Sequence, residues 1–117
     1  MKSASAHNFG CLHFREDISR LETLKNSKKI QIGFVIFLTN DTNYYKITNK
    51  KATYQNIKIY ENRKIDKKVD WLNSSENSNS ISKHDIPGLK NEYKCNWEQY
   101  SKCDDEEFKY LLLEILS

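Results

Sequence analysis

The N-terminal part of the chain alternates apolar and polar residues with the period of an α-helix. Its apolar positions recur at intervals of four, three and three residues, at Phe14, Ile18, Leu21 and Leu24. Residues at these intervals lie on one face of a helix. On the opposite face, Asp17 and Arg20 form an i,i+3 pair of opposite charge. The pattern predicts an amphipathic helix over about residues 8–25, which the polar run at 26–29 ends.

A second apolar segment extends from Ile30 to about Thr39. Gln31 and Gly33 interrupt its early part, and the remainder is apolar on both parities. A strand with this pattern is typical of a layered α/β sheet that is covered on both sides. A helix is disfavoured because the segment is short and contains Gly33. We therefore expect a central strand with both faces buried.

The middle of the chain shows weaker patterns. Ile57 and Ile59 share one parity, which favours a half-exposed strand over about residues 53–60. The polar, low-complexity run at 73–82 predicts a loop. A further strand is expected over about residues 93–97.

The C-terminal tail is compatible with two structures. Its apolar residues fit a helical stripe, and they are Phe108, Leu111, Leu112, Ile115 and Leu116. A buried strand fits the same run nearly as well, because periodicity alone does not separate helix from strand in a short apolar segment. The fold class we expect is α/β, with an N-terminal amphipathic helix, a central buried strand and a mostly β C-terminal part in a single domain over residues 1–117.

Composition narrows the class of protein only slightly. The chain has 117 residues, 38% of them hydrophobic and 30% charged, with a net charge of +3. No segment approaches the roughly 20 apolar residues that cross a bilayer, and the N-terminus has no apolar signal-peptide core. We expect a cytoplasmic protein without membrane contact. Its three cysteines are widely spaced, which favours ordinary reduced thiols over a disulfide framework.

Basic residues gather on both sides of the predicted middle strand. The candidates for contact with a DNA backbone are Lys50, Lys51, Arg63, Lys64, Lys67 and Lys68. Such cations neutralise phosphates in a salt-dependent way. The same residues also fit a solvated surface, because the acidic residues Glu61, Asp66 and Asp70 are interspersed with them.

Several short motifs occur together in a characteristic order. They are Asp17-Ile18 with Arg20-Leu21-Glu22, then Leu38-Thr39-Asn40-Asp41, Tyr44-Tyr45, Trp97 to Ser101 and Phe108 to Glu114. In this order they resemble the C-terminal part of a bacterial restriction-endonuclease family with the PD-(D/E)XK nuclease fold. The resemblance implies a partial restriction-endonuclease-like layer. It implies structural roles for Asp17, Arg20, Glu22, Thr39, Asn40, Asp41 and Trp97.

The resemblance also implies where the catalytic residues of that family lie. Its metal-binding acid and E-x-K pair precede the helix that corresponds to residues 8–25 here, so we assign no catalytic residue, metal ligand or cofactor to this chain. An intact family member would use Mg²⁺. The expected function is that of a C-terminal fragment of a DNA-cleaving protein, inactive alone. Its expected partners are duplex DNA, a second copy or the missing N-terminal half.

Three acid-x-Lys matches remain within the chain: Asp66-Lys67-Lys68, Glu92-Tyr93-Lys94 and Glu107-Phe108-Lys109. A chain this rich in acids and lysines contains roughly two or three such matches by chance, and none follows a strong apolar strand. Asp41, which does follow one, fits a turn that bonds nearby backbone N–H groups better than a ligand site at a strand end. A small binding module and a self-contained protein of unrelated role remain the alternatives to the nuclease fragment.

Overall fold

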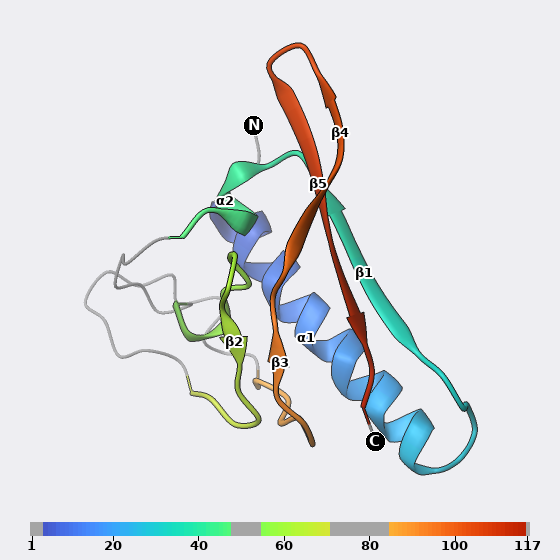
Figure 1. Ribbon diagram of the computed structural model, residues 1–117. Coiled ribbons are helices and arrows are strands. Elements are labelled where there is room, and N and C mark those ends of the chain that lie inside the picture. The colour runs from blue at the N-terminus through green and yellow to red at the C-terminus, as the bar shows by residue number, and fades with distance from the viewer. Residues whose placement is uncertain (1–3, 48–54, 71–84, 117) are drawn as a thin grey trace.

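A computed structural model describes residues 4–47, 55–70 and 85–116 of the chain (Figure 1). Its elements are α1 (Ala4–Asn26), β1 (Phe34–Thr39), α2 (Thr42–Tyr45), the 3₁₀ turn η1 (Gln55–Ile57), β2 (Lys64–Ile65), β3 (Tyr93–Lys94), β4 (Trp97–Cys103) and β5 (Glu106–Glu114). The fold is a long N-terminal helix packed against antiparallel sheet, with most strands in the C-terminal part. The coarse fold expected from the sequence is therefore confirmed.

The helix α1 forms where the periodicity places it and extends somewhat further at its N-terminal end. Phe14 and Ile18 of the predicted apolar stripe are buried, and Leu21 packs against the core. The helix ends in a tight turn, in which Lys28 adopts a positive φ of 62° and its N–H bonds to the carbonyl oxygen of Lys25. This turn directs the chain back along the helix into β1.

The main sheet has the strand order β1-β5-β4, with both neighbouring pairs antiparallel. The C-terminal tail is thus a strand, and it occupies the centre of the sheet. Asp104 turns the β4–β5 hairpin with a φ of 54°, and the hairpin extends past the end of β1 (Figure 1). Pairing on both sides stabilises the strand form, because it satisfies the backbone groups of β5 along both of its edges.

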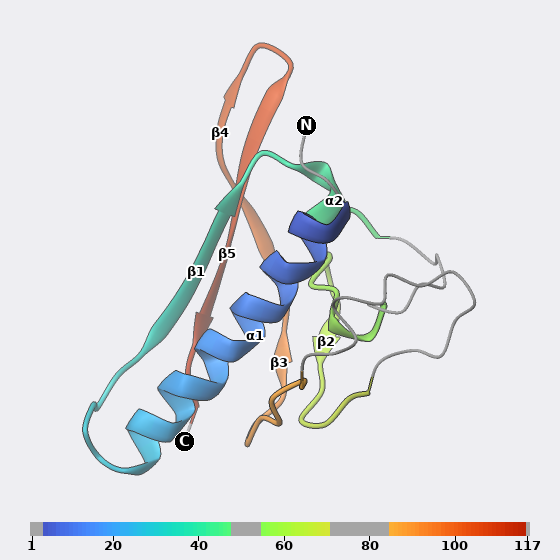
Figure 2. The ribbon, with the colours of Figure 1, turned by 180° about the vertical axis from the view of Figure 1, so that it is seen from behind.

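The burial of β1 differs from the expected one. Val35 and Thr39 face the core, whereas Phe34, Ile36 and Leu38 are exposed. The helix α1 covers one face of the sheet, behind it in Figure 1 and in front of it in Figure 2. No described element covers the other face, so the expectation that both faces of this strand are buried is wrong.

A second, short sheet pairs β2 with β3, in the register Lys64 with Lys94 and Ile65 with Tyr93. The strand expected over residues 53–60 is wrong for its described part, which contains η1 followed by irregular backbone. Ile57 and Ile59 are buried there, but the carbonyl of Ile59 bonds to the indole of Trp97 instead of a strand neighbour. The strand expected over 93–97 is divided between β3 and the start of β4. The predicted loop at 73–82 lies outside the described residues.

One hydrophobic core joins the helix and both sheets. Its largest side chains with almost no exposure include Leu12 and Ile18 of α1 and Leu111 of β5. The half-buried Phe37 packs against this core, with ring centroids 4.7 Å from Tyr44 and 6.0 Å from Trp97. Within the described part of the chain, no helix has the length and apolar content needed to cross a membrane.

Candidate functional site

Four of the six predicted basic residues lie in the described part of the chain. Lys50 and Lys51 lie outside the described residues. Arg63 stacks its guanidinium 5.4 Å from the ring centroid of Tyr60 and donates to the Tyr60 hydroxyl at 3.0 Å. Lys67 and Lys68 are exposed on the segment that follows β2. Arg63 thus contacts a protein side chain, whereas Lys67 and Lys68 stay exposed.

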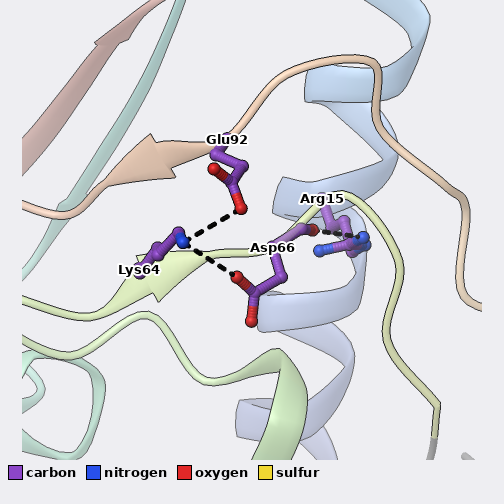
Figure 3. A network of polar contacts seen from close by, with 4 residues as sticks. All are labelled: Arg15, Lys64, Asp66 and Glu92. Carbon is purple, nitrogen blue, oxygen red and sulfur yellow. Dashed lines mark hydrogen bonds and ion pairs between the residues drawn. The ribbon is translucent and has the colours of Figure 1, made fainter.

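Lys64 is held between two carboxylates, as Figure 3 shows. Its ammonium lies 3.0 Å from Glu92 and 3.9 Å from Asp66. The hydrogen bond and charge of Glu92 raise the pKa of Lys64, and Asp66 adds to this effect. Lys64 is thus engaged with protein acids, and a phosphate would compete with them for its charge.

Asp66 and Glu92 begin two of the three acid-x-Lys matches, and the pairing of β2 with β3 makes them neighbours. Sequence reasoning missed this neighbourhood, because 26 positions separate the two residues in the chain. About half of each side chain is exposed. Among the described residues, no three His, Cys, Asp or Glu side chains are grouped so that they could hold a metal ion. The arrangement is a surface ion-pair cluster around one lysine.

The third match lies elsewhere, in β5. The ammonium of Lys109 sits 4.9 Å from the ring centroid of Tyr45, as a cation–π contact. The carbonyl oxygen of Glu107 accepts a hydrogen bond from the Tyr45 hydroxyl at 3.2 Å. These contacts join the β4–β5 hairpin to α2.

Arg15 is a buried polar residue of α1 that the sequence analysis did not single out. Only 4% of it is exposed. Its Nε donates to the carbonyl of Pro87 at 2.8 Å, and its Nη2 donates to the carbonyls of Asp66 and Lys67 at 2.9 and 3.0 Å. Burial lowers the pKa of Arg15, and the nearby acids Asp66 and Glu22 oppose that shift. The guanidinium ties the helix to two chain segments that come much later in the sequence.

Glu22 forms the second tie, and it is 1% exposed. Its carboxylate accepts hydrogen bonds from the backbone N–H groups of Lys90 and Asn91 at 2.8 and 3.1 Å, from the Asn91 amide at 3.2 Å, and from the Tyr93 hydroxyl at 2.8 Å. Burial raises the pKa of Tyr93 to about 12, and Glu22 contributes to this shift. Four donors occupy this carboxylate, so its lone pairs are used within the fold.

The positions of Arg15 and Glu22 could have been found from the sequence. Together with Cys11 and Ile18, they recur at intervals of four, three and four residues, which is also a helical stripe. This stripe lies on the buried side of α1, since all four residues are at most 4% exposed. The apolar pattern does not reveal this stripe, because two of its four residues carry charge. Glu22 was singled out only through the motif resemblance, and Arg15 was not singled out.

The Thr39-Asn40-Asp41 motif forms a local turn. Thr39 Oγ1 accepts a hydrogen bond from the backbone N–H of Asp41 at 3.0 Å. The Asp41 side chain then accepts from the N–H of Asn43 at 2.9 Å and caps α2. Asn40 is exposed. The local hydrogen bonding expected of Asp41 is confirmed.

The other motif residues contact the protein itself. The indole Nε1 of Trp97 donates to the carbonyl of Ile59 at 2.7 Å, and the Trp97 backbone N–H donates to Glu61 at 3.0 Å. Asp17 and Arg20 form the expected ion pair at 3.0 Å on the exposed side of α1. Trp97 is thus a buried packing residue with its polar atom satisfied.

The three cysteines are free thiols in contrasting surroundings. Cys11 and Cys95 are buried, and burial raises the pKa of each thiol to about 12. Cys103 is exposed near the tip of the β4–β5 hairpin. The buried pair therefore stays protonated and acts as apolar filling of the core.

An exposed apolar cluster lies on the face of the main sheet that no described element covers. The side chains of this cluster, which we call the outer-face cluster, are 52%, 65%, 51% and 47% exposed at Phe34, Ile36, Leu38 and Leu112. Ile36 and Leu112 are directly opposite each other in the pairing of β1 with β5. Contiguous exposed apolar side chains of this kind mark interaction surfaces.

The backbone of β1 is open at the same residues. The register of β1 with β5 begins at Phe34 opposite Glu114, and one residue further the N–H of Ile115 donates to the carbonyl of Gly33 at 2.8 Å. Antiparallel pairs alternate, so Val35 and Phe37 bond to β5 while Phe34, Ile36 and Leu38 turn their N–H and C=O groups away from it. In Figures 1 and 2 no described segment lies beyond β1 on that side.

The opposite edge of the sheet is formed by β4 and has a different character. Its exposed side chains include Glu98 and Lys102, and its pairing with β5 shifts register between Gln99 and Ser101. Charges and bulges are the usual protection of a sheet edge against further pairing. The edge strand β1 has neither, since it carries no charged residue and its pairing with β5 has no register shift.

Comparison of the chain with protein-family models, with curated proteins and with solved structures finds no match. The restriction-endonuclease-like relationship therefore stays a prediction from the motifs.

Proposed function

We propose that this chain is a protein-interaction module that binds an extended polypeptide segment along the open edge of β1. The observation that carries the proposal is the coincidence at Phe34, Ile36 and Leu38 of free backbone hydrogen-bonding groups with exposed apolar side chains. An added strand gains main-chain hydrogen bonds from the edge and side-chain contacts from the same residues. The segment that fits is apolar at alternate positions.

The restriction-endonuclease-like setting is part of this proposal, supported by the order of the sequence motifs. Two motif residues, Glu22 and Trp97, join parts of the chain that are distant in sequence, which suits structural roles in a nuclease-like layer. In this setting the chain contributes a scaffold and a contact surface, and catalytic acids and Mg²⁺ belong to other parts of the protein. We assign no catalytic role to this chain's own residues.

The test uses an isotope-labelled chain and a synthetic peptide of alternating valine and threonine with lysine at both ends. We expect about 1 mM peptide to protect the amide protons of Phe34, Ile36 and Leu38 from exchange, because they become hydrogen-bonded to the added strand. The amides of Val35 and Phe37 bond to β5 already and serve as internal references.

Ile36→Pro is the variant that should remove peptide binding without unfolding the sheet. The N–H of Ile36 faces the free edge, so proline at this position removes a donor to the peptide and no donor to β5. We expect the variant to fold and to lose the peptide-dependent protection. Protection that appears along β4 instead, or none on β1 at the highest peptide concentration, would contradict the proposal.

A further inference from the structure

We infer that the strand which pairs with β1 is the β1 strand of a second copy of this chain, related to the first by a two-fold axis at Ile36. This inference rests on the proposed function and names its partner. A two-fold contact presents the same surface twice, so the surface must be complementary to itself.

The side chains of β1 meet that requirement. An antiparallel pair centred on Ile36 places Phe34 opposite Leu38 of the partner strand and Ile36 opposite its own copy. Each opposed pair is apolar, and such cross-strand pairs stabilise a sheet. Phe34, Ile36 and Leu38 are the most exposed side chains of the outer-face cluster. Contact between the two β1 strands therefore removes part of their apolar surface from water.

The charge pattern allows the same pairing. Residues 30–40 contain no charged side chain, so the two copies bring no like charges together along the shared edge. A strand with a central lysine or glutamate would repel its own copy. On β4 the pairing with β5 shifts register between Gln99 and Ser101, and an irregularity of this kind protects a sheet edge against further pairing.

The backbone geometry completes the match. Phe34, Ile36 and Leu38 carry the free N–H and C=O groups of the edge, and in the register centred on Ile36 these residues face one another. Pairing supplies about six inter-strand hydrogen bonds. The result is one continuous sheet across two copies, in which β1 ceases to be an edge.

The first experiment measures the mass of the chain in solution over a range of concentrations by sedimentation or light scattering. We expect wild type to approach twice its 13.9 kDa chain mass as concentration rises. Ile36→Lys places two ammonium groups side by side at the axis, so we expect it to raise the dissociation constant at least about 100-fold. Leu38→Lys, which lies opposite Phe34 of the partner, is a second variant with the same expected direction.

Leu112→Lys is the matched control. It adds the same charge to the same face of the sheet, but on β5, which already has a strand on both sides. We expect this variant to remain a dimer. Loss of the dimer in both Ile36→Lys and Leu112→Lys would instead mean that two outer faces stack, and it would overturn pairing through the edge.

Hydrogen exchange on the wild-type chain gives a test that needs no variant. The amides of Phe34, Ile36 and Leu38 should gain protection as the chain is concentrated, and those of Val35 and Phe37 should not change. A chain that stays monomeric at all concentrations, yet gains protection with the valine–threonine peptide, overturns the second copy and leaves the strand-binding function standing. A chain that stays monomeric and gains no protection with the peptide overturns both the pairing with a second copy and the proposed strand-binding function.

Discussion

The two faces of the main sheet carry similar apolar side chains, but these side chains are buried on one face and exposed on the other. On the inner face, Leu111 and Leu113 are 0% and 5% exposed, whereas their neighbour Leu112 is 47% exposed. In β1 the same alternation separates Val35 from Ile36. The difference lies in what covers each face, since α1 packs on one of them (Figure 2).

This comparison shows that an apolar side chain is buried only where another layer meets it. Complete burial of a Leu, Ile or Phe side chain is worth about 1.5–3 kcal/mol relative to exposure. The inner face already has that stabilisation, whereas the outer-face cluster, which is about half exposed, has only part of it. The same residue type should therefore carry very different weight on the two faces.

The largest expected effect comes from Leu111→Ala, compared with Leu112→Ala on the next residue. Leu111 is completely buried at the centre of β5, so its truncation leaves a cavity and should lower the free energy of unfolding by about 2–5 kcal/mol. Leu112→Ala should lower it by less than about 1 kcal/mol. Urea unfolding at low protein concentration measures both. Equal losses would mean that the outer face is covered in the isolated chain.

A slightly smaller effect extends the comparison to two carboxylates on opposite sides of α1. Glu22→Gln leaves backbone donors of Lys90 and Asn91 facing an amide, and it should cost about 2 kcal/mol or more of stability. Asp17→Asn breaks an exposed ion pair with Arg20 and should cost about 0.2–1 kcal/mol. Thermal unfolding of the two variants gives the contrast. A Glu22→Gln loss as small as that of Asp17→Asn would contradict a buried, fully bonded carboxylate.

The smallest effect concerns the buried thiol of Cys11 at alkaline pH. Its ordinary pKa of 9.0 is raised to about 12 in the fold, so above pH 9 the unfolded chain loses this proton while the folded chain keeps it. The wild-type chain therefore loses stability as pH rises, and Cys11→Ala lacks this loss. The difference in unfolding free energy between the wild-type chain and Cys11→Ala should therefore decrease by about 1.4 kcal/mol from pH 7 to pH 10.

Urea unfolding at both pH values measures that gap. Cys103→Ser is the control, because it removes a thiol from the exposed hairpin without disturbing the core. An unchanged gap for Cys11→Ala would show that its thiol is reached by water in the folded chain.

Much of the fold follows from local pattern. The spacing of Phe14 and Ile18 indicates α1, and Asp41 after an apolar strand indicates a turn with local hydrogen bonds. The helix face that Arg15 and Glu22 share with Cys11 and Ile18 is also contained in the local spacing, although the partners of Arg15 and Glu22 are not. These features depend on residues within a few positions of one another, and one sequence window contains all the information they need.

The features that the sequence analysis predicted wrongly or missed depend on contacts between segments that are distant in the chain. The strand expected over residues 53–60 is irregular in its described part because the carbonyl of Ile59 bonds to Trp97, 38 positions away. The meeting of Asp66 and Glu92 around Lys64 depends on the pairing of β2 with β3. No local pattern encodes either contact.

The sequence by itself determined which segments are amphipathic, which are apolar, and where the turn at Asp41 stops β1. Only the tertiary structure decided that the tail is a central strand and that one face of β1 stays open. The physical reason is that the periodicity of apolar residues reflects the secondary structure that a segment favours locally. Burial and pairing depend on which distant segments pack together. Among the described elements, α1 covers one face of the sheet and none covers the other.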